Sequence, residues 1–265
     1  MFKRGVFCDK KTPKAHIISK NFFKIICNFF IGSLTTLLLW YVFYLIIDHA
    51  VLPNPIVVLS SLPNLLNHNI FSHFLHSLYR MFMGLFISMM VGLILGILAS
   101  NEKASKVFNP FLYFIYPIPR VAFLPVVMLV FGLTDTAKIV MITIVVVFPI
   151  IVVVRDTIRQ IPKITYNSLI CLGANRWQMF RFITLPYAVA GILSTLRISL
   201  GTSMAILFFT ETYGTRYGMG FFILDMWQRI NYVMMFAGIV VLGVTGFILF
   251  VFIDILENIL LRWRK

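Results

Sequence analysis

Long apolar runs alternate with short polar segments along the whole chain, and this alternation predicts transmembrane helices. A helix needs about 20 residues to cross a hydrocarbon core that is about 30 Å thick. Each of the apolar runs has room for that length, so we predict an all-α membrane protein with six transmembrane helices. The predicted spans cover residues 25–47, 74–99, 107–131, 137–158, 185–210 and 233–261.

Prolines interrupt the third and fourth predicted spans. Pro110, Pro117, Pro119 and Pro125 fall in the third, and Pro149 falls in the fourth. A proline inside a membrane helix frees backbone groups, which must be satisfied by neighbouring protein or by a watery cavity. We therefore expect the third span to border a pathway rather than to face lipid.

Small residues recur at every fourth position of the second predicted span. Positions four apart lie on one face of a helix, and small residues there let another helix approach closely. This pattern predicts tight helix packing and indicates nothing about a substrate. The stripe consists of Gly84, Ser88, Gly92 and Gly96.

Composition agrees with a polytopic membrane protein. Hydrophobic residues make up 60% of the chain and charged residues only 12%, whereas about 25% charged residues is usual for a soluble domain. The net charge of +14 could suggest nucleic acid. No zinc-finger spacing, RNA-binding aromatic motif or solvated basic domain accompanies it, so we expect a lipid bilayer and no nucleic acid as surroundings.

Lysine and arginine are distributed unevenly around the predicted spans, and cytoplasmic loops carry an excess of both. With the N-terminus inside, most of them fall on the cytoplasmic side, so we expect both termini to be cytoplasmic. The chain then divides into a basic cytoplasmic tail, 1–24, and a transmembrane domain, 25–265. The opposite side holds only Lys138, Arg216 and Arg229.

The remaining arginines, Arg80, Arg120 and Arg197, fall inside or near the ends of predicted spans. An arginine at mid-membrane costs about 2.5–3.5 kcal/mol on insertion scales, so these side chains should reach protein, an interface or water. Each could tie helices together or snorkel to the interface. Arg120 and Arg197 are also candidates for a pathway or gate.

Several kinds of active site find no support in the sequence. It holds no GxxxxGK[ST] loop for ATP, and no HExxH or GxSxG motif. His68, His73 and His76 lie close together in the chain, but no cysteine or carboxylate completes a metal site. We expect a protein that is not an enzyme and binds no metal.

Residues 163–186, KITYNSLICLGANRWQMFRFITLP, form the largest polar interruption. We predict a short helix over 163–172, ended by Gly173, and a second short helix over 175–182. Leu185-Pro186 would then open the next span, because proline fits the first turn of a helix. Such an elbow with exposed aromatic residues suits insertion into a partner's groove, although an amphipathic helix on the membrane surface is the alternative.

This stretch resembles the signature loop of ABC importer permeases, EAAxxxGxxxxxxFxxIxLP. Asn167, Ser168 and Leu169 stand where Glu-Ala-Ala is typical, which removes one negative charge from the expected contact. The resemblance covers roughly 53–265. Within this range the chain is similar to the nitrate/sulfonate/taurine-type permeases in four further segments, 52–62, 76–100, 116–139 and 210–223. The residues of the loop in register are Gly173, Ala174, Phe180, Ile183, Leu185 and Pro186.

The resemblance implies a type I ABC importer permease core with a cytoplasmic coupling loop at about 159–184, in a bacterial or archaeal plasma membrane. Two permease chains, here expected to be two copies of this one, would form the pathway. ATPase subunits would hold the loop and bind ATP and Mg, so this chain would need no cofactor. An external binding protein would deliver the cargo.

The same resemblance assigns candidate roles to individual residues. Arg120, Arg197 and Glu211 become pathway or gate candidates. Arginines that face a pathway would suit an anion such as a sulfonate, taurine or nitrate. A neutral or aromatic vitamin precursor is the alternative cargo, and a stand-alone channel, a secondary carrier or a scaffold is the alternative function. The candidates for ATPase coupling are Asn167, Ser168, Gly173, Ala174, Trp177, Phe180, Ile183, Leu185 and Pro186.

Overall fold

The structure is a computed structural model that describes residues 14–47, 49 and 51–261. All regular elements among these residues are helices. The chain divides into two compact units, residues 1–60 and 61–265. The predicted boundary between a basic tail, 1–24, and a transmembrane domain stays a prediction, because the structure does not describe the side chains of this tail.

The first unit contains helix α1 (Lys14–Ile47) and nearly all of α2 (Pro55–Ser61). Residues 31–47 of α1 form an apolar helix, somewhat shorter than a full span. Two of its hydroxyl groups bond within the helix, since Thr35 donates to the Ile31 carbonyl at 2.9 Å and Thr36 to the Gly32 carbonyl at 2.8 Å. This bonding lets polar side chains sit in an apolar helix at little cost.

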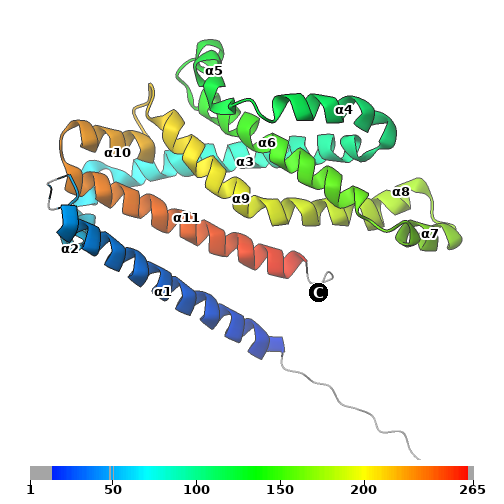
Figure 1. The fold of residues 1–265 in the computed structure, drawn as a ribbon, viewed down its shortest axis with the longest axis horizontal. Helices are drawn as coiled ribbons and strands as arrows, with labels where there is room; N and C mark the ends of the chain where they lie inside the picture. The colour runs from blue at the N-terminus through cyan, green and yellow to red at the C-terminus, as the bar shows by residue number, and fades with distance from the viewer. Residues whose placement is uncertain (1–13, 48, 50, 262–265) are drawn as a thin grey trace, which may run out of the picture. The chain divides into compact units, whose positions relative to one another are not determined.

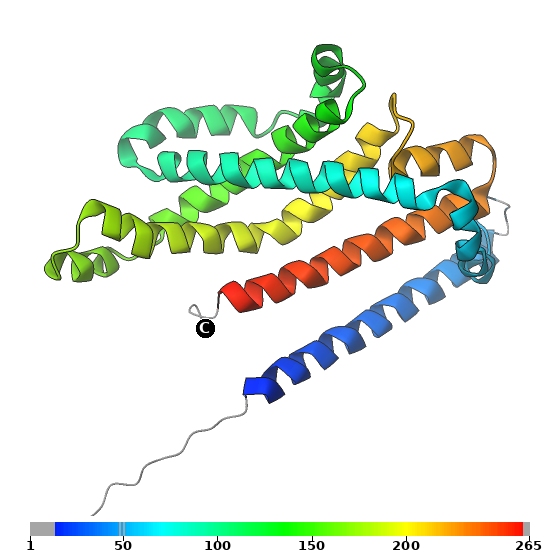
Figure 2. The ribbon, with the colours of Figure 1, turned by 180° about the vertical axis from the view of Figure 1, so that it is seen from behind.

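The second unit is built around α3, α6 and α9, which lie side by side (Figures 1 and 2). A pair of helices, α4 and α5, covers one side of α6, while α10 and α11 lie along α9. The elements in order are η1 (Leu62–His68), α3 (Ile70–Ser100), α4 (Glu102–Ile115), η2 (Arg120–Phe123), α5 (Leu124–Phe131), α6 (Asp135–Arg159), α7 (Lys163–Cys171), α8 (Arg176–Met179), the π-turn η3 (Phe180–Thr184), α9 (Leu185–Glu211), α10 (Met219–Gln228) and α11 (Tyr232–Leu260).

The small-residue stripe of α3 lies against α6. A Cβ atom on Gly92 would come within 2.5 Å of Ile150 Cγ2, and one on Gly84 within 2.7 Å of Ile142 Cγ2. Only hydrogen fits at these positions, because such distances are far inside van der Waals contact. The stripe, Gly84, Ser88, Gly92 and Gly96, meets Ile142, Ile150 and Val154 of α6.

Four helices in the described residues are long and apolar enough to cross a membrane: 70–100, 135–159, 176–211 and 232–257. A fifth results if the bent pair α4 and α5 counts as one span. The fold is therefore all-helical with four to five candidate spans. The first predicted span, 25–47, falls on α1, whose residues 31–47 form the shorter apolar helix.

The third predicted span, 107–131, is not one straight helix. Residues 102–115 and 120–131 form two helical segments that meet at 85°. Pro117 and Pro119 occupy the corner; proline lacks an N–H donor, and it also disfavours helical geometry in the preceding residue. The prolines thus interrupt the span, as predicted, and divide it into two helical segments.

Candidate functional site

The elbow begins with a sharply defined helix end. Gly173 has φ = +77°, a left-handed conformation that other residues rarely adopt. Its N–H donates to the Ile170 carbonyl at 2.9 Å, and the N–H of Ala174 donates to the Leu169 carbonyl at 3.0 Å. These two bonds make a complete Schellman motif, which satisfies the last carbonyls of α7 and reverses the chain.

The next helix starts at once. The Asn175 side chain accepts a hydrogen bond from the Gln178 N–H, and the Gln178 side chain accepts one from the Asn175 N–H, both at 2.8 Å. This reciprocal capping box satisfies two N–H groups that a helix start leaves free. A capped end followed directly by a capped start fixes the angle of the elbow.

Beyond the elbow, the structure corrects our prediction of two separate helices. Residues 176–211 form one continuous helix instead of a short helix over 175–182 and a new span from Leu185. The π-turn 180–184 connects them, with the Leu185 N–H donating to the Phe180 carbonyl. This wider turn accommodates Pro186, which has no N–H of its own, so the proline lies inside a helix.

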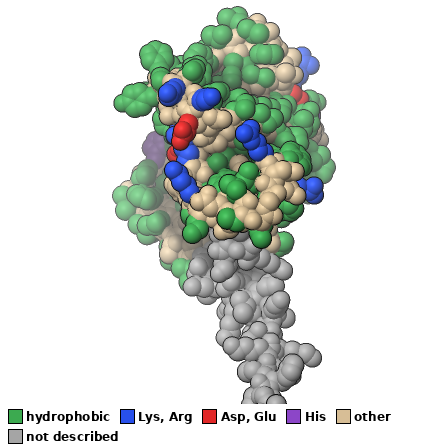
Figure 3. Space-filling model, turned by 90° about the vertical axis from the view of Figure 1, so that its right-hand side faces the viewer, with side chains coloured by type: hydrophobic (Ala, Val, Ile, Leu, Met, Phe, Trp, Pro, Cys, Tyr) green, Lys and Arg blue, Asp and Glu red, His purple; other side chains and the backbone are tan. Residues whose placement is uncertain are grey.

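The tip of the elbow is apolar, aromatic and basic. The Trp177 side chain is 64% exposed and stacks on Phe180 with ring centroids 5.5 Å apart. Lys163, Arg176 and Arg181 are exposed around it. Figure 3 views the molecule from the elbow end, where Lys and Arg side chains lie among hydrophobic ones. Exposed large apolar side chains next to charges are typical of a protein interaction site.

The residues that we predicted for ATPase coupling differ in exposure. Asn167, Ser168 and Gly173 are exposed, whereas Ile183 is only 3% exposed and packs in the core of the second unit. The Ile183 side chain thus faces its own chain rather than open space. Ala174, Phe180, Leu185 and Pro186 are partly buried.

One contact in the elbow had no signal in the sequence. The hydroxyl groups of Tyr166 and Thr184 lie 3.1 Å apart, which ties α7 to the π-turn. The bond joins residues that are 18 positions apart, and no helical periodicity relates positions so far apart on two different helices. It links the two arms of the elbow through their side chains.

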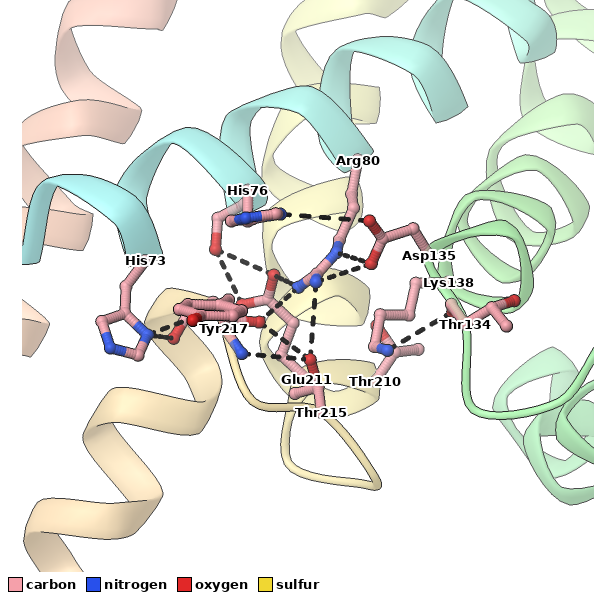
Figure 4. Close-up of polar contacts among 12 residues, drawn as sticks. His73, His76, Arg80, Thr134, Asp135, Lys138, Thr210, Glu211, Thr215 and Tyr217 are labelled. Carbon is pink, nitrogen blue, oxygen red and sulfur yellow. Dashed lines mark hydrogen bonds and ion pairs between the residues drawn. The ribbon is translucent and has the colours of Figure 1, made fainter. Parts of the chain in front are cut away.

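A buried charge network lies at the other end of α3 and α9 (Figure 4). Glu211 is fully buried, and Arg80 donates to its carboxylate from Nη1 at 2.6 Å. Ser77 donates to both oxygens at 2.8 Å, and the Gly220 N–H donates at 2.9 Å. A buried carboxylate with an arginine and this full set of donors is well compensated.

Arg80 extends the network to two further elements. Its Nη2 lies 2.7 Å from Asp135 at the start of α6, and its Nη1 donates to the Tyr217 carbonyl at 2.7 Å. Gly218, with φ = +138°, passes so close that a Cβ atom would lie 2.4 Å from Glu211 Cδ. The network therefore fixes the 212–218 loop onto α3, and Arg80 ties helices together.

The histidines take part in this packing. His73 accepts a hydrogen bond from the Gly218 N–H at 3.1 Å, and His76 stacks on Tyr217 with centroids 5.0 Å apart. Among the described residues, no three His, Cys, Asp or Glu side chains are grouped so as to hold a metal ion. The polar groups here bond one another and the loop backbone.

The three pathway or gate candidates stand in different surroundings. Glu211 is enclosed by the network and faces no open space. Arg197 of α9 is half-exposed and pairs with Asp254 and, at 3.6 Å, with Glu257 of α11. The Arg120 guanidinium lies 5.0 Å from the ring centroids of Tyr116 and of Phe148.

The fold, which is all-helical with four to five candidate membrane spans, is similar to that of ABC importer permeases. The chain aligns with the solved inward-facing MetNI methionine ABC transporter at a TM-score of 0.53 and 18% identity, over 72% of this chain and 93% of that one. That likeness concerns the fold alone.

The chain belongs to the family of binding-protein-dependent transport system inner membrane components, whose pattern matches residues 88–264. It is 30% identical over 222 residues to the putative aliphatic sulfonates transport permease protein SsuC of Bacillus subtilis, covering 83% of this chain and 80% of the relative. It is 29% identical over 215 residues to the formylaminopyrimidine transport permease protein ThiX of Halalkalibacterium halodurans, covering 81% and 86%.

Membership of this family confirms the resemblance seen in the sequence. The chain is an inner-membrane, multi-pass permease of an importer, and in this family ATP is bound by a partner ATPase. The family implies ATPase subunits and a binding protein as partners.

Proposed function

We propose that this permease forms one half of a two-copy translocation pathway for a small solute, and that its elbow, residues 163–184, transmits the movement of a bound ATPase. Closure of an ATPase pair would push the elbow and rock the helices between two packings. The chain itself supplies no catalytic residue in this scheme.

The geometry of the elbow carries this proposal. Capping at Gly173 and at Asn175, and the bond between Tyr166 and Thr184, make a stiff, protruding element. The continuous helix 176–211 leads from it to the charge network around Glu211. A rigid lever of this kind suits the transfer of force from one end of a helix bundle to the other.

The direction of insertion is part of the proposal. Lys163, Arg176 and Arg181 on the elbow and Lys103 and Lys106 before it argue for a cytoplasmic elbow, because cytoplasmic loops are rich in Lys and Arg. Both termini then lie in the cytoplasm. The 212–218 loop lies on the external side, where a binding protein docks.

For the cargo we favour a small anion, such as a sulfonate, taurine or nitrate. The SsuC relative is named for aliphatic sulfonates, and the second unit holds arginines within its spans. A neutral aromatic vitamin precursor is the second candidate, because the ThiX relative is named for formylaminopyrimidine at almost the same identity.

A stand-alone channel, a secondary carrier or a scaffold would give the elbow no ATPase to hold. Replacing Gly173 distinguishes these functions from the proposed ATPase-coupled transport. A Cβ atom at this position meets nothing within 4 Å, so a substitution acts through the backbone conformation alone. Asn tolerates positive φ, whereas a β-branched residue such as Val does not.

We expect Gly173→Val to insert normally into the membrane but to lose the ATPase subunits, or their ATP-driven coupling, while Gly173→Asn keeps both. The measurement is affinity isolation of each variant in mild detergent, followed by quantification of the associated ATPase and of its ATP turnover. Equal ATPase recovery and turnover with Gly173→Val and the native chain would contradict the proposal.

A further inference from the structure

The three arginines inside the spans differ in how their charge is compensated. Arg80 and Arg197 each pair with two carboxylates. Arg120 has no ion-pair partner among the residues that the structure describes, although it also belongs to a predicted span. A charge inside a membrane helix is costly and is usually paired or functional. Of these three arginines, Arg120 is therefore the one whose charge no described carboxylate compensates.

Neutral groups hold the Arg120 guanidinium in place. Its Nη1 donates to the Val145 carbonyl at 3.3 Å and its Nη2 to the Tyr116 carbonyl at 3.4 Å. The Val145 carbonyl is available because Pro149, four residues later in α6, has no N–H to offer it. The rings of Tyr116 and Phe148 add cation–π contacts at 5.0 Å each. These groups orient the guanidinium without cancelling its charge.

The position of Arg120 suits a ligand. It follows the proline corner between α4 and α5, where the helices meet at 85°. Irregular backbone at membrane depth is tolerated where it is buried in protein or lines a watery cavity, and broken helices form the ligand sites of many transporters. The Nη2 end of the side chain lies on the exposed side, next to the half-exposed Tyr116, whereas Nε is buried and has no hydrogen-bond partner among the described residues.

We propose that Arg120 binds the anionic group of the cargo, an oxyanion such as a sulfonate, a carboxylate or nitrate. Arginine carries five N–H donors in a planar fork that matches such groups, and only two N–H groups here meet backbone carbonyls. This inference rests on the proposed transport function and adds the residue that selects the charge of the cargo.

The alternative is that Arg120 only ties the α4–α5 corner to α6. Two substitutions separate these roles. Arg120→Gln removes the charge and leaves a shorter, uncharged amide. Arg120→Lys keeps the charge but loses the planar fork. Arg229→Gln is the matched control, because Arg229 is exposed and pairs only with Asp225 on its own helix among the described residues.

The test uses the assembled complex in lipid nanodiscs and measures its melting temperature while sodium isethionate, a small sulfonate, is titrated. An equal concentration of sodium chloride serves as the reference salt. We expect a saturable rise in melting temperature with isethionate beyond that with chloride, kept by Arg229→Gln and lost by Arg120→Gln. Arg120→Lys should need severalfold more isethionate for half of the effect.

The inference is overturned if the native complex shows no isethionate effect beyond that of chloride, or if Arg120→Gln keeps the effect. Should Arg120→Gln not assemble, the Lys variant decides, and an unchanged half-saturating concentration overturns the inference. ATPase recovery in the same samples separates this outcome from a failure of the proposed function. An intact complex without an anion effect contradicts only the role of Arg120.

Discussion

At the scale of single residues, the helix packing of this chain depends on glycines, which have no Cβ atom. On α3, Gly84, Gly92 and Gly96 let α6 approach so closely that any Cβ atom would overlap an Ile or Val side chain. Other glycines are not under this constraint, since a Cβ atom on Gly201 of α9 meets nothing within 4 Å. The two kinds of helical glycine allow a matched experiment.

We predict that Gly92→Ala destabilises the protein by about 1–3 kcal/mol, because the added methyl group collides with Ile150 and the packed interface must shift. Gly201→Ala should be neutral or stabilising by up to about 1 kcal/mol, since alanine is the better helix former. Reversible unfolding of both variants in the same detergent gives the comparison. Equal stability of the two variants would show that the α3–α6 approach is looser than the structure has it.

Residue patterns in the sequence predict contacts that a single element contains. The four-residue spacing of the stripe and Gly173 at the end of an apolar helical pattern are both local signals. The burial of Glu211 has no such signal, because its partners come from α3 and from the backbone of α10. Arg80 and Ser77 stand three residues apart on one helix face, which hints at a shared partner but cannot identify it.

At the scale of elements, the charge network connects segments that lie far apart in the sequence. Arg80 of α3 bonds Glu211 at the end of α9, Asp135 at the start of α6 and the carbonyl of Tyr217 in the following loop. Removing one partner of a buried pair leaves the other charge unpaired. The network should therefore respond very differently to single and double substitutions.

We predict that Arg80→Met destabilises the protein by about 3–5 kcal/mol, because the Glu211 carboxylate is then buried without its counter-charge. Combining it with Glu211→Gln should recover part of that loss. Arg229→Ala, which breaks an exposed pair with Asp225, should change stability by at most about 0.5 kcal/mol. A double-mutant cycle from unfolding curves measures these values, and additive effects of the two buried substitutions would contradict a direct pair.

Helix existence was predictable from apolar run length, but helix ends next to proline were not. Pro117 and Pro119 break a predicted span into two segments at 85°, whereas Pro186 is absorbed inside the continuous helix 176–211 by a π-turn. The same residue type thus ends one helix and not another. The difference lies in whether the neighbouring turns can widen and keep the freed carbonyls bonded, which depends on tertiary packing.

At the scale of the whole molecule, the second unit leaves much apolar surface uncovered. Only 11% of the apolar window of α11 is buried within the chain, against 56% for α6. The large side chains of α4 and α5 are also exposed, among them Tyr113 and Leu129. A lipid bilayer and a second permease chain together account for such surfaces in a transport subunit. The elbow adds further exposed apolar side chains, among them Trp177, and we propose the ATPase as their partner.

The sequence indicates the class of the molecule at this scale through its composition, basic loops and elbow signature, whereas stoichiometry and cargo depend on chains outside it.

The most direct test isolates a tagged copy from its native membrane in mild detergent, with a differently tagged copy expressed beside it. We predict that the second copy and a P-loop ATPase co-isolate with the first, at one ATPase per permease. Reproducible recovery of a folded chain without any ATPase would contradict our account.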